Sequence, residues 1–243
     1  MTIALVGDFD EKIHTHVALN RSIEHCAHGL PYEVEARWIP TERLPRTFSG
    51  PLNYSGLWIA PASPYQNDAG VYEVIRKARE ENIPIIGSCG GFQYMIIEYA
   101  KNVLKIKDAG HAENEPNAIP VVSKLSCSLK GQEELVSITD KSSWLYAVLQ
   151  AESVVGKYYC SYGINPAFQE SLNKLPLVFT AFSPTGEVRA FELKGHRFFK
   201  GTLFQPSLDS SAEHPNPLIK SFFEACREPD IFQDGKFLAS HSL

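Results

Sequence analysis

The segment at residues 83–100 constrains the fold of this chain more than any other. A run of buried-strand type at residues 83–86 stops at Gly87, Cys89 follows at the turn, and an amphipathic helix begins at once. Glycines flank the thiol on both sides, and residues without a side chain let the backbone turn sharply from strand to helix. The pattern predicts a nucleophile elbow, in which Cys89 lies exposed over a helix N-terminus whose free N–H groups favour the thiolate.

Strands and helices alternate through the first hundred residues. Apolar patterning predicts strands at residues 3–6, 32–39 and 57–60 and helices at residues 13–26 and 71–81. This spacing predicts parallel strands joined by right-handed crossovers. Sites form at the carboxyl ends of such strands, so the loops at Gly7, Pro61 and Cys89 are expected to meet there.

The second half of the chain has a different pattern. Short runs of β type dominate it, and antiparallel strands or hairpins are the simplest interpretation. These runs lie at residues 119–122, 134–139, 152–160, 177–182, 188–195 and 198–205. A last helix is predicted at residues 217–226, and the tail after about residue 228 is weakly specified.

Composition excludes several classes of protein. Hydrophobic residues make up 44% and charged residues 21%, as in ordinary globular proteins. The net charge of -5 gives no support for a nucleic-acid surface. Neither a membrane span nor a signal peptide is expected, because no apolar run approaches about 18 residues and acidic residues come early. We expect a soluble, cytoplasmic protein without nucleic-acid or membrane partners.

The cysteines and acidic residues do not suggest a metal site. Five cysteines are scattered without a C-x-x-C pair, at positions 26, 89, 127, 160 and 226, so we expect reduced thiols and no zinc. The acidic residues at 113–115 are too few for a cation cage. Glycine-rich phosphate-binding motifs are absent, and no cofactor is expected.

The elbow sequence GSCGGFQ, at residues 87–93, resembles the G-x-C-x-G-x-Q elbow of class I glutamine amidotransferases. The surrounding sequence is most similar to the C-terminal glutaminase domain of CTP synthase and to stand-alone proteins related to that region. The likeness is carried by residues 3–12, 76–109, 162–166 and 198–206. It implies one α/β domain over residues 1–243, a flavodoxin-like three-layer sandwich with a central mixed, mostly parallel sheet. Nothing in the chain resembles the synthetase half, so a complete CTP synthase is not expected.

The resemblance also implies a mechanism whose parts are incomplete here. In the family the elbow cysteine attacks the side-chain amide of glutamine, and a late F-H-P-E motif supplies the base and its orienter. In this chain Gln205 stands at the position of the histidine and Ser207 at that of the glutamate. An amide accepts no proton near neutral pH, so general base catalysis is lost. The rate of glutamine hydrolysis should therefore fall by about 10²–10⁴-fold.

Two other family features are altered. The oxyanion loop P-G-G-F-G reads Pro-Ala-Ser-Pro-Tyr at residues 61–65, so the N–H groups of Ser63 and Gly90 are the candidate oxyanion donors. Pro64 biases Ser63 toward an extended conformation, which disfavours the family's loop shape. The R-H-R-Y-E run, whose arginine helps to hold the substrate carboxylate, corresponds to residues 159–163, which contain no cation.

Several side chains are candidates for the pocket around Cys89. The resemblance places Cys160 at the substrate site, although a strand-end cysteine is the alternative; a reversible disulfide or a resolving role follows if the two sulfurs come within reach. Gln93 is expected to bond backbone near the elbow. The predicted pocket residues are Tyr65, Gln93, Cys160, Tyr162, Gln205 and Ser207.

Histidines elsewhere in the chain offer a substitute base. His111 and Glu113, shortly after the elbow helix, are the best replacements for base and orienter, with a solvated polar loop as the alternative. His14 and His16 follow the first strand and either face the site or lie on a helix surface.

Three functional hypotheses follow. The first is a divergent relative of the glutaminase domain, without the His/Glu pair, whose reactive Cys89 acts on a small amide, ester or thiol compound or in thiol redox chemistry. The second is an active amidotransferase with a Cys89–His111 dyad that supplies ammonia to a separate synthetase. The third is a non-catalytic binding or regulatory module. Expected partners are glutamine or a related amide, a synthetase or regulatory protein, and a second copy of the chain.

Overall fold

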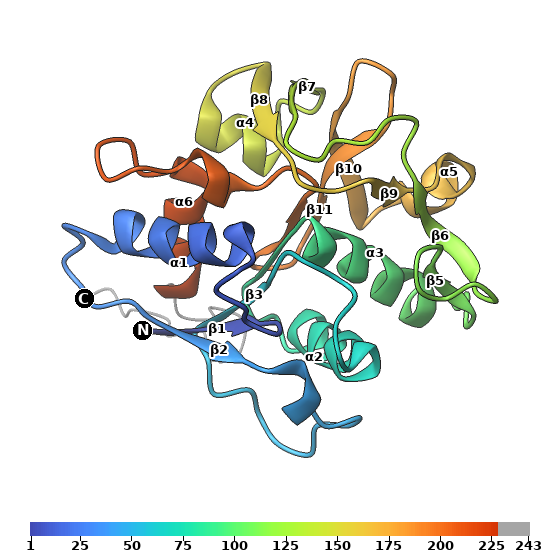
Figure 1. The fold of residues 1–243 in the computed structure, drawn as a ribbon, viewed down its shortest axis with the longest axis horizontal. Helices are drawn as coiled ribbons and strands as arrows, with labels where there is room; N and C mark the ends of the chain where they lie inside the picture. Colours follow the sequence, from blue (N-terminus) through green and yellow to red (C-terminus); the bar gives the residue numbers. More distant parts are fainter. Residues whose placement is uncertain (228–243) are drawn as a thin grey trace, which may run out of the picture.

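The computed structural model describes residues 1–227, and the predicted weakly specified tail lies outside the described residues. The first half alternates strands and helices as the pattern predicts (Figure 1). Its elements are β1 (Thr2–Val6), α1 (His14–Ala27), β2 (Glu35–Ile39), β3 (Gly56–Ile59), α2 (Asp68–Glu80), β4 (Ile85–Ser88) and α3 (Gly90–Asn102), with a 3-10 turn at Thr41–Arg43.

The second half contains more elements than its sequence pattern predicts. Its strands are β5 (Ala109–His111), β6 (Ile119–Lys124), β7 (Glu133–Ile138), β8 (Ser153–Lys157), β9 (Tyr162–Ile164), β10 (Leu177–Phe182), β11 (Val188–Leu193) and β12 (Phe199–Thr202). Its helices are α4 (Trp144–Leu149), α5 (Gln169–Leu172) and α6 (Pro217–Arg227), with 3-10 turns η2 (Pro166–Phe168) and η3 (Pro206–Asp209). Strands β5 and β9 and helices α4 and α5 are the additions.

One mixed sheet organises the molecule. Its nine strands lie in the order β2-β1-β3-β4-β12-β11-β10-β7-β8. Strands β2, β1, β3, β4 and β12 are parallel neighbours, whereas β11, β10, β7 and β8 pair antiparallel with their neighbours. Strands β5, β6 and β9 form a second, small sheet. The expected α/β fold class with a central mixed sheet is confirmed.

Alternation along the central strands divides the core into two layers. In β1, Ala4 and Val6 belong to the apolar cluster that includes α2 and α3, whereas Ile3 and Leu5 belong to the cluster that includes α1 and α6. Figure 1 shows the two helix pairs on opposite faces of the sheet. Successive strand residues point to opposite faces, so a strand buried on both sides is apolar throughout.

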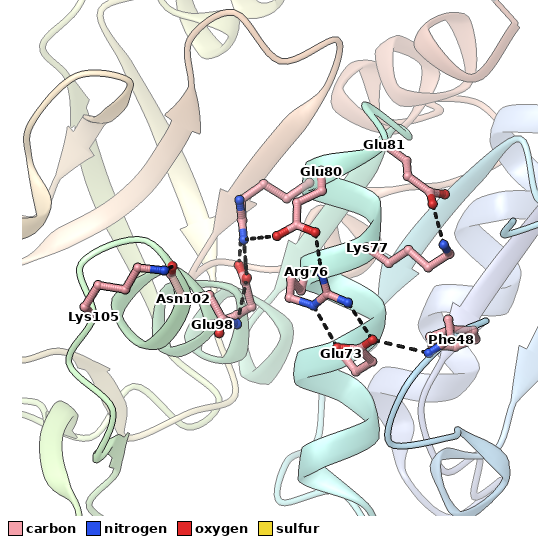
Figure 2. Close-up of polar contacts among 10 residues, drawn as sticks. Phe48, Glu73, Arg76, Lys77, Glu80, Glu81, Glu98, Asn102 and Lys105 are labelled. Atoms are coloured by element: carbon pink, nitrogen blue, oxygen red, sulfur yellow. Dashed lines mark hydrogen bonds and ion pairs between the residues drawn. The ribbon is translucent and has the colours of Figure 1, made fainter. Parts of the chain in front are cut away.

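One ion pair joins the elbow helix α3 to α2. Glu98 of α3 is fully buried, and Arg79 of α2 donates to it at 2.7 Å. Figure 2 shows Glu98 facing the charged residues of α2, where Arg76 lies between Glu73 and Glu80. A buried carboxylate without a partner is costly, so the Arg79–Glu98 pair sets how the two helices pack.

The described residues contain no helix that is both long and apolar enough to span a membrane.

Candidate active site

Cys89 occupies a strained backbone position between β4 and α3. Its φ and ψ angles are 53° and −110°, a region that residues with a side chain rarely adopt. The neighbouring backbone leaves no room for a side chain: a Cβ added to Gly91 would lie 2.1 Å from the carbonyl oxygen of Ile59. The strand therefore turns into the helix at a point where only glycine fits, as the elbow pattern predicts. Strain of this kind costs of order 1–3 kcal/mol and is typical of functional sites.

The loop after β3 lies against this elbow. A Cβ on Gly90 would lie 2.9 Å from the backbone nitrogen of Ser63, so the loop and the start of α3 are in close contact. The N–H groups of Gly90 and Ala62 bond to the Cys89 sulfur. Ala62 has a φ of 71°, in the left-handed region that residues with a side chain rarely adopt. Backbone donors at a thiol stabilise its anionic form without adding a cation.

A cavity of about 270 Å³ opens above the Cys89 sulfur. It lies at the carboxyl ends of β1, β3, β4 and β12, where the parallel topology predicts a site. Only 6% of Cys89 is exposed, so the thiol is reached through the cavity rather than displayed on the surface. The lining residues are Ile13, Thr15, Ala62, Ser63, Cys89, Gln93, Glu113, Lys130, Tyr159, Cys160, Ser161, Tyr162 and Gln205.

Cys160 is the side chain that most affects Cys89. Its thiol donates a hydrogen bond to the Cys89 sulfur, and this contact lowers the pKa of Cys89 although burial opposes the change. The same contact and burial raise the pKa of Cys160 well above its usual value. The carbonyl of Tyr159, 3.8 Å from the Cys89 sulfur, accepts only from the protonated thiol. Cys89 therefore ionises first, and Cys160 keeps its proton.

Gln205 shares this cavity, but Ser207 does not. Gln205 is 1% exposed, and its Oε1 and Nε2 atoms have no hydrogen-bond partner among the described residues. Ser207 lies beyond it in η3 and lines a second cavity between that turn and α1. Its buried Oγ likewise lacks a partner within residues 1–227. The positions of the family's base and orienter thus hold unpaired, uncharged groups.

His111 lies in strand β5 and not in a solvated polar loop. The ring is 1% exposed, and its Nδ1 accepts from the N–H of Glu113 at 3.1 Å. Its Nε2 must then carry the proton, and it donates to Oε1 of Gln93 at 3.1 Å. Burial lowers the pKa of His111 to about 4. Both ring nitrogens are used away from Cys89, whereas the exposed Glu113 lines the cavity.

The other predicted residues support the walls of the cavity. Gln93 donates from Nε2 to the carbonyl of Tyr162 at 2.7 Å and so ties α3 to the segment that carries Cys160. Ser63 donates to Oε1 of Gln93 at 3.4 Å. Tyr65 does not line the cavity, because its ring packs against Tyr94 beneath the loop and its hydroxyl donates to the carbonyl of Ala60.

The two early histidines lie at the edge of this site. His16 is buried, accepts from the N–H of Asp10 and donates to the carbonyl of Pro61 at 3.0 Å. Burial lowers the pKa of His16, so the ring is neutral and supports the loop after β3 through its hydrogen bond to Pro61. His14 is exposed and packs edge-on against Tyr159, with ring centroids 4.3 Å apart.

Sequence reasoning missed Lys130 and Tyr159. Lys130 lies between β6 and β7 and brings a cation to the cavity, which the segment at residues 159–163 lacks. The sequence around Lys130 contains no pattern that indicates a site, because only the fold brings the segment between β6 and β7 close to Cys89. The cavity lining therefore includes one carboxylate, one ammonium group, two tyrosines and a pair of thiols.

Comparisons with known proteins agree with the fold and with the elbow. Residues 13–225 match the family Glutamine amidotransferase class-I. CTP synthase of Campylobacter jejuni is 30% identical over 245 residues, and the match covers 92% of this chain and 45% of that enzyme. CTP synthase of Sulfolobus acidocaldarius is 27% identical over 234 residues, with 90% and 44% covered. The chain thus spans about half the length of these relatives.

A solved structure has a similar fold. The glutaminase domain of Trypanosoma brucei CTPS with bound acivicin superposes with a TM-score of 0.82 at 26% identity, and the match covers 93% of each chain. The family match extends over most of the sequence, and this similarity extends over most of the fold. The chain belongs to the class I glutamine amidotransferase family.

Proposed function

We propose that this protein is a divergent class I glutamine amidotransferase-like protein in which the Cys89 thiolate attacks a small acyl compound without the family's His/Glu pair. One observation carries the proposal: Gln205 lies in the cavity with Cys89, and no histidine among residues 1–227 lines it. The nucleophile is nevertheless supported, because Cys160 and the N–H groups of Gly90 and Ala62 lower the pKa of Cys89. Ordinary glutamine hydrolysis is therefore not the expected reaction.

The missing base decides which acyl compounds react. The thiolate adds to the carbonyl carbon, and the N–H groups of Gly90 and Ser63 are our candidates to hold the oxyanion. Ammonia leaves an amide only after a proton is delivered to nitrogen, and Gln205 delivers none. An ester or thioester with a weakly basic leaving group needs no such proton. The acyl group then stays on Cys89 longer than in a glutaminase, because no base activates water.

The lining suggests an amino-acid-like ligand. Glu113 and Lys130 bring opposite charges to the same cavity, and neither side chain has an ion-pair partner among the described residues. A zwitterion the size of glutamine would satisfy both groups. The relative with bound acivicin makes that compound a suitable probe. A separate synthetase or regulatory protein as partner rests only on the likeness to CTP synthase.

The proposal is tested with p-nitrophenyl acetate, whose leaving group needs no proton. We expect a burst of one equivalent of nitrophenolate, an acetyl group on the Cys89 peptide by mass spectrometry, and no ammonia from glutamine above the Cys89→Ser background. Cys127→Ser removes an exposed thiol and should leave the burst unchanged. A burst that persists in Cys89→Ser, or glutamine turnover that depends on Cys89 at ordinary glutaminase rates, would overturn the proposal.

A further inference from the structure

Cys89 and Cys160 are the two thiols that the fold brings into contact. Both are free, both are 6% exposed, and both line the cavity of about 270 Å³. The Cys160 side chain acts as a hydrogen-bond partner of Cys89, and both side chains line the same cavity. Cys160 lies in the connection between β8 and β9, where its carbonyl accepts from the N–H of Leu129 at 3.0 Å.

The two sulfurs are not equivalent. The N–H groups of Gly90 and Ala62 bond to the Cys89 sulfur, and the helix α3 begins directly after it. These donors keep the negative charge on Cys89, while Cys160 remains a thiol. A nucleophilic thiolate beside a protonated partner is the arrangement in which one sulfur reacts first and the other resolves the product.

The remaining buried cysteines show what an inert thiol looks like in this fold. Cys226 packs against Gly56, where an added Cβ would lie 2.2 Å from its sulfur, and burial raises its pKa. Cys26 is bonded to Ser210 and to the carbonyl of Asn216, and burial raises its pKa too. Neither lines the cavity. Among the buried cysteines, oxidation should therefore be confined to the cavity pair, because susceptibility follows thiolate character and access.

Gln205 suits a redox step better than a proton transfer. Gln205 lines the cavity, its two amide atoms are buried without a partner among the described residues, and the amide neither gives nor takes a proton. A hydroperoxide needs no proton from this position, because its leaving alkoxide takes a proton from solvent. The cavity volume restricts the reagent to a small compound.

We propose that Cys89 and Cys160 form a peroxide-reducing dithiol, with Cys89 as the reacting thiolate and Cys160 as the resolving thiol. The Cys89 sulfur attacks the distal oxygen of a small hydroperoxide, the O–O bond breaks, and the alkoxide leaves with a proton from solvent as an alcohol or water. Cys160 then attacks the sulfenic sulfur, a disulfide forms and water leaves. The two electrons come from the thiol pair, and an external dithiol returns them by exchange.

This activity shares the Cys89 thiolate with the proposed acyl chemistry, but it alone requires Cys160. The test treats the reduced full-length protein with one equivalent of hydrogen peroxide and maps peptides without reduction. We expect a Cys89–Cys160 linked peptide, formed about tenfold faster than any oxidation of the exposed Cys127. In Cys160→Ser, dimedone should instead trap a sulfenic acid on Cys89. Dithiothreitol should restore both thiols and support repeated turnover, one dithiol consumed per peroxide.

The outcomes separate this inference from the proposed function. If p-nitrophenyl acetate acylates Cys89 while peroxide leaves Cys160 as a free thiol beside an over-oxidised Cys89, the redox pair is wrong and the acyl chemistry stands. If the disulfide forms but no acylation occurs, the redox pair stands alone. Oxidation of Cys127 at the same rate as Cys89 would also overturn the inference, because the cavity would then confer no advantage.

Discussion

The two walls of the cavity differ in how completely their polar groups are paired. The elbow wall, which we define as Cys89 and Gln93 with the loop at Ser63, is held by hydrogen bonds and by glycine contacts that exclude any side chain. The facing wall, defined as Cys160 and Gln205, carries an amide with neither atom paired among the described residues. The elbow wall keeps the G-x-C-x-G-x-Q pattern, whereas the facing wall has an amide, Gln205, at the position where the resemblance implies a histidine.

This difference shows which part of the site tolerates change. The elbow is locked by backbone packing, so its residues cannot vary without cost to folding. The facing wall is not locked in this way, and an unpaired buried amide there lowers stability by about 1–3 kcal/mol. Groups that cost stability are retained where they act on a ligand.

Gly91→Ala should damage the elbow wall most. The new methyl would lie 2.1 Å from the carbonyl oxygen of Ile59, and backbone cannot move aside as a flexible side chain could. We expect the free energy of unfolding to fall by about 4 kcal/mol, measured by urea denaturation. Gly50→Ala is the matched control, because nothing lies within 4 Å of its added Cβ. A loss below about 1 kcal/mol for Gly91→Ala would show that the elbow is not locked by packing.

His111 should make the elbow wall sensitive to acid. Its pKa is lowered to about 4 in the folded protein, so the unfolded chain, with a pKa near 6.5, binds the proton more tightly. Stability from His111 is complete above pH 6.5 and is lost as the pH falls toward 4, by about 3 kcal/mol in total. Urea denaturation of wild type and His111→Asn between pH 7.5 and 4 measures the difference. An equal pH dependence in both proteins would exclude His111 as the cause.

Restoring a base on the facing wall should revive amide hydrolysis. In the double variant Gln205→His with Ser207→Glu, the introduced imidazole lines the cavity with Cys89 and the carboxylate lies two residues on. Ammonia release from glutamine should rise by about 10²-fold over wild type. Ser207→Glu alone should stay at background, because it adds an orienter without a base. If the double variant is folded, labelled by acivicin and still inactive, the missing base is not what separates this protein from glutaminases.

Two glutamines offer the finest comparison between the walls. Gln205→Leu removes an unpaired buried amide and should raise the free energy of unfolding by about 1 kcal/mol. Gln93→Leu removes an amide with three partners and should lower it by about 1–3 kcal/mol. Thermal and urea unfolding of both variants measure the sign of each change in the free energy of unfolding. Destabilisation by Gln205→Leu of the same size as by Gln93→Leu would mean that Gln205 is paired in solution.

Much of this architecture could be predicted from local sequence patterns. The strands that become β1, β3 and β4 are apolar on both faces, and the glycines around Cys89 predict the turn that carries it. Strand β5 could not be predicted, because Ala109, Gly110 and His111 show no apolar period and become a strand only through pairing with β6. His111 consequently looked like a loop residue free to act as a base, whereas the pairing buries it against Gln93.

The elbow pattern and the presence of Gln205 and Ser207 in the late F-x-P-x segment are local features of the sequence. Strand, glycine turn and helix are set by neighbouring residues, so the position of Cys89 follows without knowledge of the rest of the molecule. The contact between Cys89 and Cys160, and the arrival of Lys130 at the same cavity, depend on how β7, β8 and β9 pack at the end of the sheet. Long-range contacts of this kind arise from the packing of the whole core, and they decide what the thiol faces and hence what it can do.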